Sequence, residues 1–319
     1  MSKGNWREST KNSVSTSQLE IHKEYDKKSE VLFPLLIPSF VANNIDFNNQ
    51  HDPILKQVIP LKHELKKQIG YHNDPVGDIK ASADNGVIHK YHGRVLLIAS
   101  GLCAINCRYC FRRNFNYAEN HASGKNWKKA IDYIKLNKDI NEVILSGGDP
   151  LMLSTKALNK LTIQLTKISH IKTLRIHTRI PIVAPHRITE NFITWLNSLP
   201  FKKVMVLHCN HPNELSQNLR EVLHKISHSN TFLLNQSVLL KDINDDAKIL
   251  SQLSHRLFDF GIMPYYLNQL DKAKGTYHFR VSNKTAKSIH KKLLKILPGY
   301  LVPKLVEEIS GKLNKSPII

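Results

Sequence analysis

The chain has little cysteine, few acidic residues and no long apolar run. Only four cysteines occur among its 319 residues, which excludes a disulfide-rich secreted scaffold. The longest apolar stretches, such as VLFPLLIP, are short and broken by proline, whereas a membrane-spanning helix needs about 20 apolar residues. The opening MSKGNWREST has no apolar core of the kind that a secretory signal requires. We therefore expect a cytoplasmic location and no association with a membrane.

Acidic residues are outnumbered by basic ones, 26 against 46, so the formal net charge is +20. A strongly basic surface can attract polyanions such as nucleic acid. The lysines, however, are spread along the whole chain instead of being massed in one block. That distribution is typical of solvated helix faces, and we do not expect nucleic acid to be the partner.

Short apolar segments alternate with longer amphipathic segments from residue 89 onward. Each apolar segment is rich in Val, Ile, Leu or an aromatic residue, as is typical of buried parallel strands. Between them, apolar residues recur at helical spacing, and Thr189 and Asp245 suit the N-cap positions of two helices. The predicted strands cover residues 94–100, 142–146, 173–178, 203–208, 231–239 and 261–267.

Six strand–helix units imply a parallel sheet with right-handed crossovers. A complete (β/α)8 barrel needs roughly 250 residues, so we predict an α/β fold with an open, partial (β/α)6 barrel over residues 89–298. A doubly wound sheet is the alternative, which the strand pattern does not exclude. Residues 1–88 are predicted to form a mostly helical N-terminal region, and residues 299–319 a C-terminal segment. In either fold the ligand site lies beyond the carboxyl ends of the strands.

Three of the four cysteines lie together in GLCAINCRYCFRRNF, directly after the first predicted strand. Cys103, Cys107 and Cys110 have the spacing C-x3-C-x2-C, and Cys209 is far along the chain. A zinc site usually takes four Cys or His ligands, and a [4Fe–4S] cluster takes four thiolates. Three thiolates on a four-iron cluster would leave one iron open to another ligand. A zinc loop and a chance group of buried cysteines are the alternatives.

The cysteine spacing, its place after a first strand and Tyr109 before the last cysteine resemble the radical S-adenosylmethionine (SAM) enzymes. The resemblance implies a [4Fe–4S] cluster on these three cysteines, with SAM bound to the open iron. LSGGDPLML follows the second strand, where this family has a glycine-rich turn for the methionine amino group. Glycine lacks a Cβ, so a ligand can approach its backbone closely. The implied SAM contacts are Ser146, Gly147, Gly148 and Asp149.

Most of the chain resembles one group of these enzymes, the lysine 2,3-aminomutases. The stretches that carry the resemblance are DPILKQVIP, KYHGRVLLIASGLCAINCRYCFRRNF, LSGGDPLML, LRIHTRIPIVAPHRIT, HCNHPNEL, LLNQSVLLKDIND and GKLNKSPI. The length and the end shortly after Lys315 look most like the short branch, which makes β-lysine for elongation factor P. The resemblance implies an isomerase that converts (S)-α-lysine into (R)-β-lysine, which a separate ligase attaches to that factor.

Pyridoxal phosphate is the other cofactor that this resemblance implies. Lys315, in NKSP, matches the family lysine that forms the Schiff base, and such a lysine must lose its proton to react. Without the resemblance, a lysine so near a chain end is most often a solvated tail residue. A planar guanidinium such as that of Arg94 suits phosphate oxygens. The implied pyridoxal phosphate contacts are Lys315, Lys90, Tyr91, Arg94, Arg179 and Gln236.

Substrate lysine has a carboxylate and a distal ammonium group, and the resemblance implies a partner for each. Arg112 stands two residues after the last cysteine, where the family has the partner of the carboxylate. Asp271 and Glu308 match the two carboxylates that hold the ammonium group, which is costly to bury unpaired. The long branch of the family has aspartate where this chain has Glu308, so the reach of this side chain differs. A surface ion pair is the alternative interpretation of each residue.

An electron donor such as flavodoxin or ferredoxin is a further implied partner, beside elongation factor P and its lysine ligase. Three other functions stay open at this point. A free-standing lysine 2,3-aminomutase would supply β-lysine to metabolism, and a radical SAM enzyme acting on RNA would bind RNA in a salt-dependent manner. A basic iron–sulfur binding protein without turnover is the non-enzymatic alternative. The 17 histidines show no HExxH or comparable metal-ligand spacing.

Overall fold

The computed structural model describes residues 6–84, 86–117 and 126–319. Its centre is a ten-stranded sheet whose strands follow one another in chain order. Strands β3 to β9 are parallel, whereas β1, β2 and β10 pair antiparallel with their neighbours. In a barrel the strands follow one another in chain order, whereas in a doubly wound sheet the strand order reverses at one point. The observed order is therefore that of a barrel. The strands are β1 Ser82–Asp84, β2 Val87–Tyr91, β3 Arg94–Ser100, β4 Glu142–Gly147, β5 Thr173–Thr178, β6 Lys202–His208, β7 Thr231–Leu239, β8 Met263–Gln269, β9 Lys304–Glu307 and β10 Ser316–Pro317.

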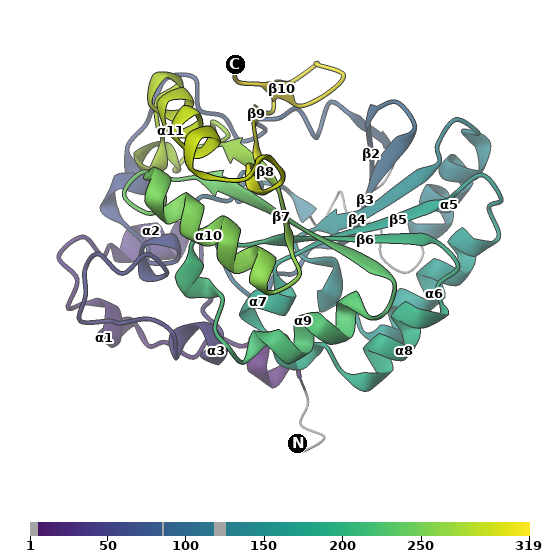
Figure 1. Ribbon diagram of the computed structural model, residues 1–319, viewed down its shortest axis with the longest axis horizontal. Helices are drawn as coiled ribbons and strands as arrows, with labels where there is room; N and C mark the ends of the chain where they lie inside the picture. The colour runs from purple at the N-terminus through teal and green to yellow at the C-terminus, as the bar shows by residue number, and fades with distance from the viewer. Residues whose placement is uncertain (1–5, 85, 118–125) are drawn as a thin grey trace.

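Helices connect the parallel strands and cover the outer side of the sheet (Figure 1). The predicted partial (β/α)6 barrel is thereby confirmed, with β9 as an additional parallel strand beside β8. The helices of this part are α5 Asn126–Leu136, α6 Thr155–Thr166, α7 Ile180–Val183, α8 Glu190–Ser198, α9 Leu219–Ser227, α10 Ala247–Asp259 and α11 Asn283–Ile296.

Strand β5 shows how the sequence separates the core from the interior of the barrel. Successive side chains of a strand point to opposite faces of a sheet. Leu174 and Ile176 are buried in the apolar core beneath the helices, whereas Arg175 and His177 line a cavity on the other face. The polar residues of this strand are therefore available to a ligand, and its apolar residues hold the helices.

The N-terminal region contains only short helices, which are joined by turns. They are α1 Thr16–Leu19, α2 Lys27–Leu32 and α3 Ser39–Ala42, and short 3-10 turns lie before α1, at Glu8–Thr10, and after α3, at Leu55–Gln57 and Lys62–Leu65. The longest, α2, has six residues, so the region is less helical than the sequence suggested. Residue 88, the predicted boundary of this region, lies within β2 and thus within the central sheet.

A buried arginine joins this region to the cysteine loop. The Arg108 guanidinium donates hydrogen bonds to the Glu64 carboxylate at 2.9 and 2.6 Å and to the Phe33 carbonyl oxygen at 2.6 Å. Arg108 is completely buried. The N-terminal region therefore supports the loop that carries the cysteines.

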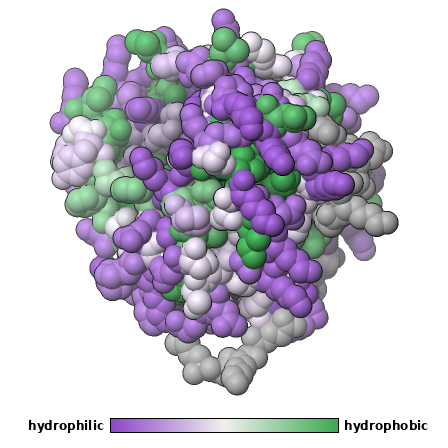
Figure 2. Space-filling view, turned by 90° about the vertical axis from the view of Figure 1, so that its right-hand side faces the viewer, coloured by the Kyte–Doolittle hydropathy of each residue, from purple (hydrophilic) through white to green (hydrophobic). Residues whose placement is uncertain are grey.

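Charged side chains occupy much of the surface. Figure 2 shows hydrophilic residues spread over the face seen from the right of Figure 1, with apolar residues in small groups. Exposed lysines project from several helices, as expected of solvated helix faces. Among the described residues, no helix has the length and apolar character that crossing a membrane demands.

Candidate functional site

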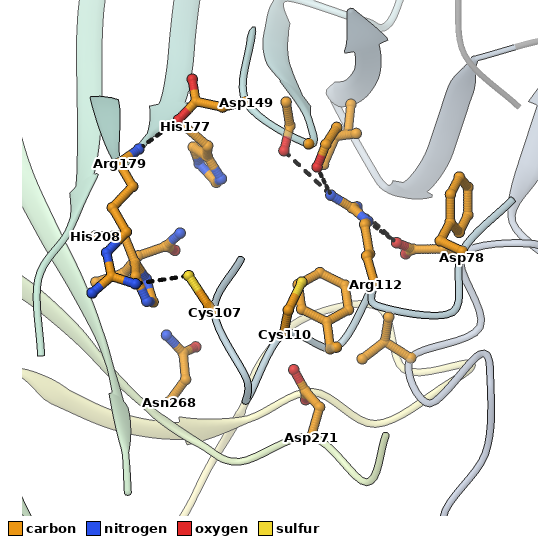
Figure 3. Close-up of a pocket in the computed structure, with 18 of the residues that line it drawn as sticks. Asp78, Cys107, Cys110, Arg112, Asp149, His177, Arg179, His208, Asn268 and Asp271 are labelled. Carbon is orange, nitrogen blue, oxygen red and sulfur yellow. Dashed lines mark hydrogen bonds and ion pairs between the residues drawn. The ribbon is translucent and has the colours of Figure 1, made fainter. Parts of the chain in front are cut away.

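One cavity of about 600 Å³ lies on the inner side of the barrel. Figure 3 shows Cys107 and Arg179 on one side of this cavity and Arg112 with Asp78 on the other. Every site residue predicted from the sequence lines it, namely Lys90, Tyr91, Arg94, Cys103, Cys107, Cys110, Arg112, Ser146, Gly147, Gly148, Asp149, Arg179, Gln236, Asp271, Glu308 and Lys315.

The three cysteines lie in the loop that follows β3. Burial raises the pKa of the Cys103 thiol and raises the pKa of the Cys110 thiol to about 11, and the neighbouring sulfurs add to both shifts. Thiolates that lie close together are stable only where positive charge joins them, as it does in an iron–sulfur cluster. The donor set therefore fits a cluster with three cysteine ligands. Among the described residues, no three His, Cys, Asp or Glu side chains are placed to hold a single metal ion.

Arg179 lies beside the cysteine loop. Its Nη1 group donates to the Cys107 sulfur at 2.7 Å and to the Tyr109 hydroxyl oxygen at 2.8 Å. Its Nη2 group donates to Gln57 Oε1 at 2.8 Å and to Glu214 Oε2 at 2.6 Å. Only the Nε group lacks a partner within the part of the chain described. Most hydrogen-bond donors of Arg179 are thus bonded to atoms of the protein itself, and a contact with pyridoxal phosphate stays a prediction.

The glycine-rich turn after β4 packs directly against the start of the cysteine loop. Gly147 has φ +120°, and a Cβ there would lie 2.3 Å from the Ser100 carbonyl oxygen. A Cβ on Gly148 would lie 2.5 Å from the Leu102 carbonyl oxygen, and the Asp149 amide donates to that same oxygen at 2.7 Å. The turn therefore needs glycine for its own packing, beside any approach of a ligand.

The Asp149 carboxylate is hydrogen-bonded to other groups of the protein. Its carboxylate accepts hydrogen bonds from the Leu151 amide at 3.0 Å, the Thr178 hydroxyl at 2.8 Å and the Arg179 amide at 2.8 Å. Burial raises its pKa to about 6 although these donors oppose the shift. Asp149 joins the end of β4 to the end of β5, and these hydrogen bonds fix the shape of the glycine-rich turn.

Lys315 and Glu308 form an ion pair on the wall of the cavity. Lys315 Nζ lies 3.1 Å from Glu308 Oε2, and the Tyr91 hydroxyl donates to Glu308 Oε1 at 2.5 Å. Burial alone would raise the pKa of Glu308, but Lys315, Tyr91 and Lys90 hold it below its usual value. Glu308 is thus occupied by three groups of the protein in this structure.

Arg94 supplies the anion-binding chemistry that a phosphate group needs. Its guanidinium lies over the Tyr91 ring, 4.8 Å from the ring centre. It forms no ion pair with any of the residues described. A lysine amine and an unpaired guanidinium in one cavity fit pyridoxal phosphate.

Arg112 is paired with a carboxylate that sequence reasoning missed. Its Nε and Nη2 groups both lie 2.7 Å from Asp78 Oδ2. Its Nη1 group approaches Ser146 Oγ at 3.3 Å and the Gly147 carbonyl oxygen at 3.4 Å. The structure therefore brings Arg112, the predicted partner of the substrate carboxylate, next to the glycine-rich turn, with Asp78 as its counter-ion.

Asp271 presents a carboxylate to the cavity with no hydrogen-bond partner among the described residues. Burial raises its pKa to about 7, Glu308 and Asp78 add to the shift, and Lys315 and Lys90 oppose it. Gln236 lines the same cavity from β7, between His208 on β6 and Tyr266 on β8. A ligand with an ammonium group could pair with Asp271 without displacing a group of the protein.

Three further polar residues face the cavity without being predicted. His177 Nε2, Arg175 Nε and Asn268 Oδ1 are buried and lack hydrogen-bond partners within the described ranges. Burial, followed by nearby positive charge, lowers the pKa of His177 far below its ordinary value, so this imidazole is neutral. The two-residue period of β5 could have identified Arg175 and His177, since Arg179 was already expected to face the cavity.

Comparisons with known proteins match this chain to radical SAM enzymes. Residues 97–194 match the model of the radical SAM superfamily. The chain is 44% identical to an L-lysine 2,3-aminomutase of Haemophilus influenzae, over 98% of this chain and 95% of the relative. It is 46% identical to an L-lysine 2,3-aminomutase of Buchnera aphidicola, over 95% and 89%. A solved radical SAM methyltransferase from Sphaerobacter thermophilus shares 14% identity, with a TM-score of 0.48 over 69% of this chain and 68% of that chain.

The superfamily match and the L-lysine 2,3-aminomutase relatives imply a [4Fe–4S] cluster, SAM and pyridoxal phosphate as cofactors. The three thiols suit the cluster, the glycine-rich turn suits SAM, and Lys315 together with Arg94 suits pyridoxal phosphate. By its superfamily match and its identity with relatives over most of its length, this chain is an isomerase that belongs to the L-lysine 2,3-aminomutase family of radical SAM enzymes.

Proposed function

We propose that this enzyme converts (S)-α-lysine into (R)-β-lysine in the cavity described above. The strongest support is the 44% identity, over 98% of this chain, with a relative named L-lysine 2,3-aminomutase. A second support is that the three thiols and Lys315 line the same cavity. The cofactors and the substrate would therefore meet in one enclosed space, away from bulk water.

In this proposal the cysteine loop and the glycine-rich turn serve the radical chemistry. When bound, the cluster and SAM supply an adenosyl radical, and pyridoxal phosphate supplies the group that carries the migrating nitrogen. Cys103, Cys107 and Cys110 hold the cluster, and the Arg179 guanidinium donates to the Cys107 sulfur. The SAM contacts come from Ser146 to Asp149, and the engaged carboxylate of Asp149 fixes the turn.

The other side of the cavity holds pyridoxal phosphate and the substrate in this proposal. Lys315, in the C-terminal segment 299–319, binds pyridoxal phosphate covalently, and Arg94 binds its phosphate group. Arg112 binds the substrate carboxylate, and Asp271 binds the distal ammonium group because its carboxylate has no hydrogen-bond partner among the residues that the structure describes. Glu308 adds negative charge near that ammonium group while it orients Lys315.

The remaining predicted contacts act around these residues. Lys90 and Tyr91 contact Glu308, at 3.6 Å and 2.5 Å respectively. They therefore hold the C-terminal segment in place as well as facing the phosphate. Gln236 stays a predicted cofactor contact from β7.

For the physiological role, we propose that the product is used for β-lysylation of elongation factor P in the cytoplasm. The resemblance of this chain to the short branch of the family supports this assignment. Flavodoxin or ferredoxin supplies the electron, and a separate ligase consumes the β-lysine.

The direct test is an anaerobic assay. Protein reconstituted with iron, sulfide and pyridoxal phosphate receives reductant, SAM and lysine, and β-lysine is measured together with its configuration. Formation of (R)-β-lysine is expected. A protein that carries a full cluster and forms no β-lysine contradicts the proposal, and strong salt-dependent RNA binding in its place favours an enzyme that modifies RNA.

Replacement of the proposed cofactor lysine provides a spectroscopic test. The Lys315→Ala variant is expected to lose the absorption band of lysine-bound pyridoxal, because the variant lacks the amine that forms the imine with the cofactor. Its activity falls by about three orders of magnitude or more. Lys312→Ala is the matched control, since Lys312 is an exposed lysine of the same segment. A variant at Lys315 with an unchanged spectrum assigns the cofactor to another lysine.

A further inference from the structure

The turn 74–78, with the sequence DPVGD, is built to bring a carboxylate into the cavity. The Asp74 carboxylate accepts hydrogen bonds from the Asp78 amide at 2.8 Å and from the Ile79 amide at 3.1 Å. Gly77 has φ +70°, and a Cβ there would lie 2.3 Å from Ser310 Oγ in the C-terminal segment. The turn is therefore folded by its own side chains and seated against the segment that carries Lys315.

The same region also contacts the loop of Asp271. The His72 amide donates to the Lys272 carbonyl oxygen, and the Lys274 amide donates to the His72 carbonyl oxygen, both at 2.9 Å. A short stretch before the barrel thus contacts two loops that carry proposed substrate and cofactor residues.

Asp78, at the end of this turn, neutralises two cations of the cavity. Its Oδ2 atom receives both the Nε and Nη2 groups of Arg112 at 2.7 Å, and its Oδ1 atom lies 2.6 Å from Lys90 Nζ. Only 4% of Asp78 is exposed, so water cannot replace either partner. Burial alone would raise the pKa of Asp78, but Arg112 and Lys90 hold it below its usual value, so the carboxylate is ionised.

These contacts extend to the proposed cofactor lysine. Lys90 Nζ lies 3.6 Å from Glu308 Oε1, and Glu308 Oε2 lies 3.1 Å from Lys315 Nζ. The result is a line of alternating charges, from Arg112 through Asp78, Lys90 and Glu308 to Lys315. Its two ends are the residues assigned to the substrate carboxylate and to pyridoxal phosphate.

Removal of the Asp78 charge would disturb both ends of this line. Arg112 would lose the carboxylate that pairs with it. Among the described residues, Lys90 would keep Glu308 alone as an ionic partner. A buried cation without its partner is strongly unfavourable and reorients toward whatever oxygen it can reach. The guanidinium would then no longer be held in one orientation for a planar carboxylate.

We propose that Asp78 is a positioning residue of the substrate site, which orients Arg112 for the α-carboxylate of the substrate and ties it to Glu308 and Lys315. The inference rests on the proposed function and extends it, because it makes a free α-carboxylate the feature that this site selects. Preorganisation of this kind lowers the cost of binding without any contact between Asp78 and the substrate.

The experiment compares L-lysine with L-lysinamide, which lacks the carboxylate. Calorimetry measures both affinities in the cofactor-loaded protein without reductant, so that no turnover occurs, and steady-state kinetics then gives KM and kcat for lysine. In Asp78→Asn, Kd and KM for lysine are expected to rise about tenfold or more, with kcat within about threefold. The affinity for lysinamide stays within about twofold, and Asp78→Glu, which keeps the charge, recovers part of the lysine affinity.

Glu64→Gln is the matched control, because Glu64 is a buried carboxylate shared by two arginines, Arg108 and Arg113. It is expected to lower the melting temperature and to leave the preference for lysine over lysinamide unchanged. An unchanged or improved lysine affinity in Asp78→Asn, or an equal loss for both ligands, overturns the inference. Binding is measured without turnover, so a wild-type protein that makes no β-lysine contradicts the proposed function while Asp78 is still tested.

Discussion

The Cys107 sulfur has a guanidinium as its neighbour, whereas the Cys209 sulfur is enclosed by the apolar core. We expect Cys107→Ala to lose bound iron and inorganic sulfide and at least about three orders of magnitude of activity, because radical formation depends on the cluster. Cys209→Ala is the control and should keep its iron. Iron and sulfide analysis after anaerobic reconstitution measures both variants, and a Cys107→Ala protein with full iron and turnover removes Cys107 from the ligand set.

Asp271 gives the proposed substrate site a specific pH dependence. Its pKa is raised to about 7 by burial, Glu308 and Asp78 add to the shift, and Lys315 and Lys90 oppose it. The carboxylate therefore becomes protonated below that pH and loses its attraction for an ammonium group. From about pH 8 to about pH 6, KM for lysine should rise roughly tenfold, and Asp271→Asn should show a higher KM with no such slope.

The same shift predicts the pH dependence of stability. A carboxylate whose pKa is raised in the folded state binds its proton more tightly there than in the unfolded chain. The contribution of Asp271 to the free energy of unfolding therefore falls as the pH rises from about 4 to about 7. Denaturant titrations of the wild type and Asp271→Asn measure this term, and parallel pH profiles of the two proteins would contradict it.

Among the elements, the turn after β4 depends most directly on a single residue type. Gly147→Ala places a methyl group 2.3 Å from the Ser100 carbonyl oxygen at φ +120°, so the turn must shift away from the cysteine loop. We expect a loss of about 1–3 kcal/mol in the free energy of unfolding and weaker SAM binding. Gly299→Ala is the control, because nothing lies within 4 Å of its Cβ position. Equal melting temperatures for the two variants would show that the turn relaxes freely.

The strands were predictable where local pattern and tertiary position agree. The bounds of β3, β5 and β7 are those predicted from the apolar runs. The last predicted strand, 261–267, is displaced from β8 at Met263–Gln269, because Gly261 and Ile262 belong to the turn that ends α10.

The helix caps show a limit of local chemistry. Thr189 caps α8 as predicted, but Asp246 and not Asp245 caps α10. The Asp245 carboxylate instead accepts a hydrogen bond from the Asp242 amide. Two adjacent aspartates have the same capping chemistry, so the sequence alone could not choose between them.

At the scale of the molecule, contacts between distant segments determined what the sequence did not reveal. Strand β9 has four residues and β10 has two, and each is stabilised by its pairing with a neighbour and not by a pattern of its own. The resemblance to the family predicted Glu308 and Lys315 as site residues. It predicted neither their ion pair nor the contacts of the turn 74–78. Those depend on segments that meet only after the barrel has formed.

The barrel is open, and its two edges are joined by side chains. β2 lies near one end of the sheet order and β9 near the other, and Figure 1 shows both at the upper side of the molecule. The Tyr91 hydroxyl donates to Glu308 Oε1 across this gap, between residues 217 positions apart. This contact helps to hold the C-terminal segment, since no backbone pairing joins β2 to β9 among the described strands.

Tyr91→Phe should therefore loosen one edge of the barrel and leave its centre unchanged. The variant keeps the ring beside Arg94 but removes a hydrogen bond to a charged group, which is worth about 1.5–3 kcal/mol. Amide exchange in residues 304–317 should become roughly tenfold faster or more, while exchange in β5 and β6 stays the same. Tyr300→Phe is the control, since Tyr300 is 58% exposed. If exchange becomes faster across the whole sheet, the two edges and the centre unfold as one cooperative unit. If exchange in residues 304–317 is unchanged, Lys90 and Lys315 hold Glu308 without the tyrosine.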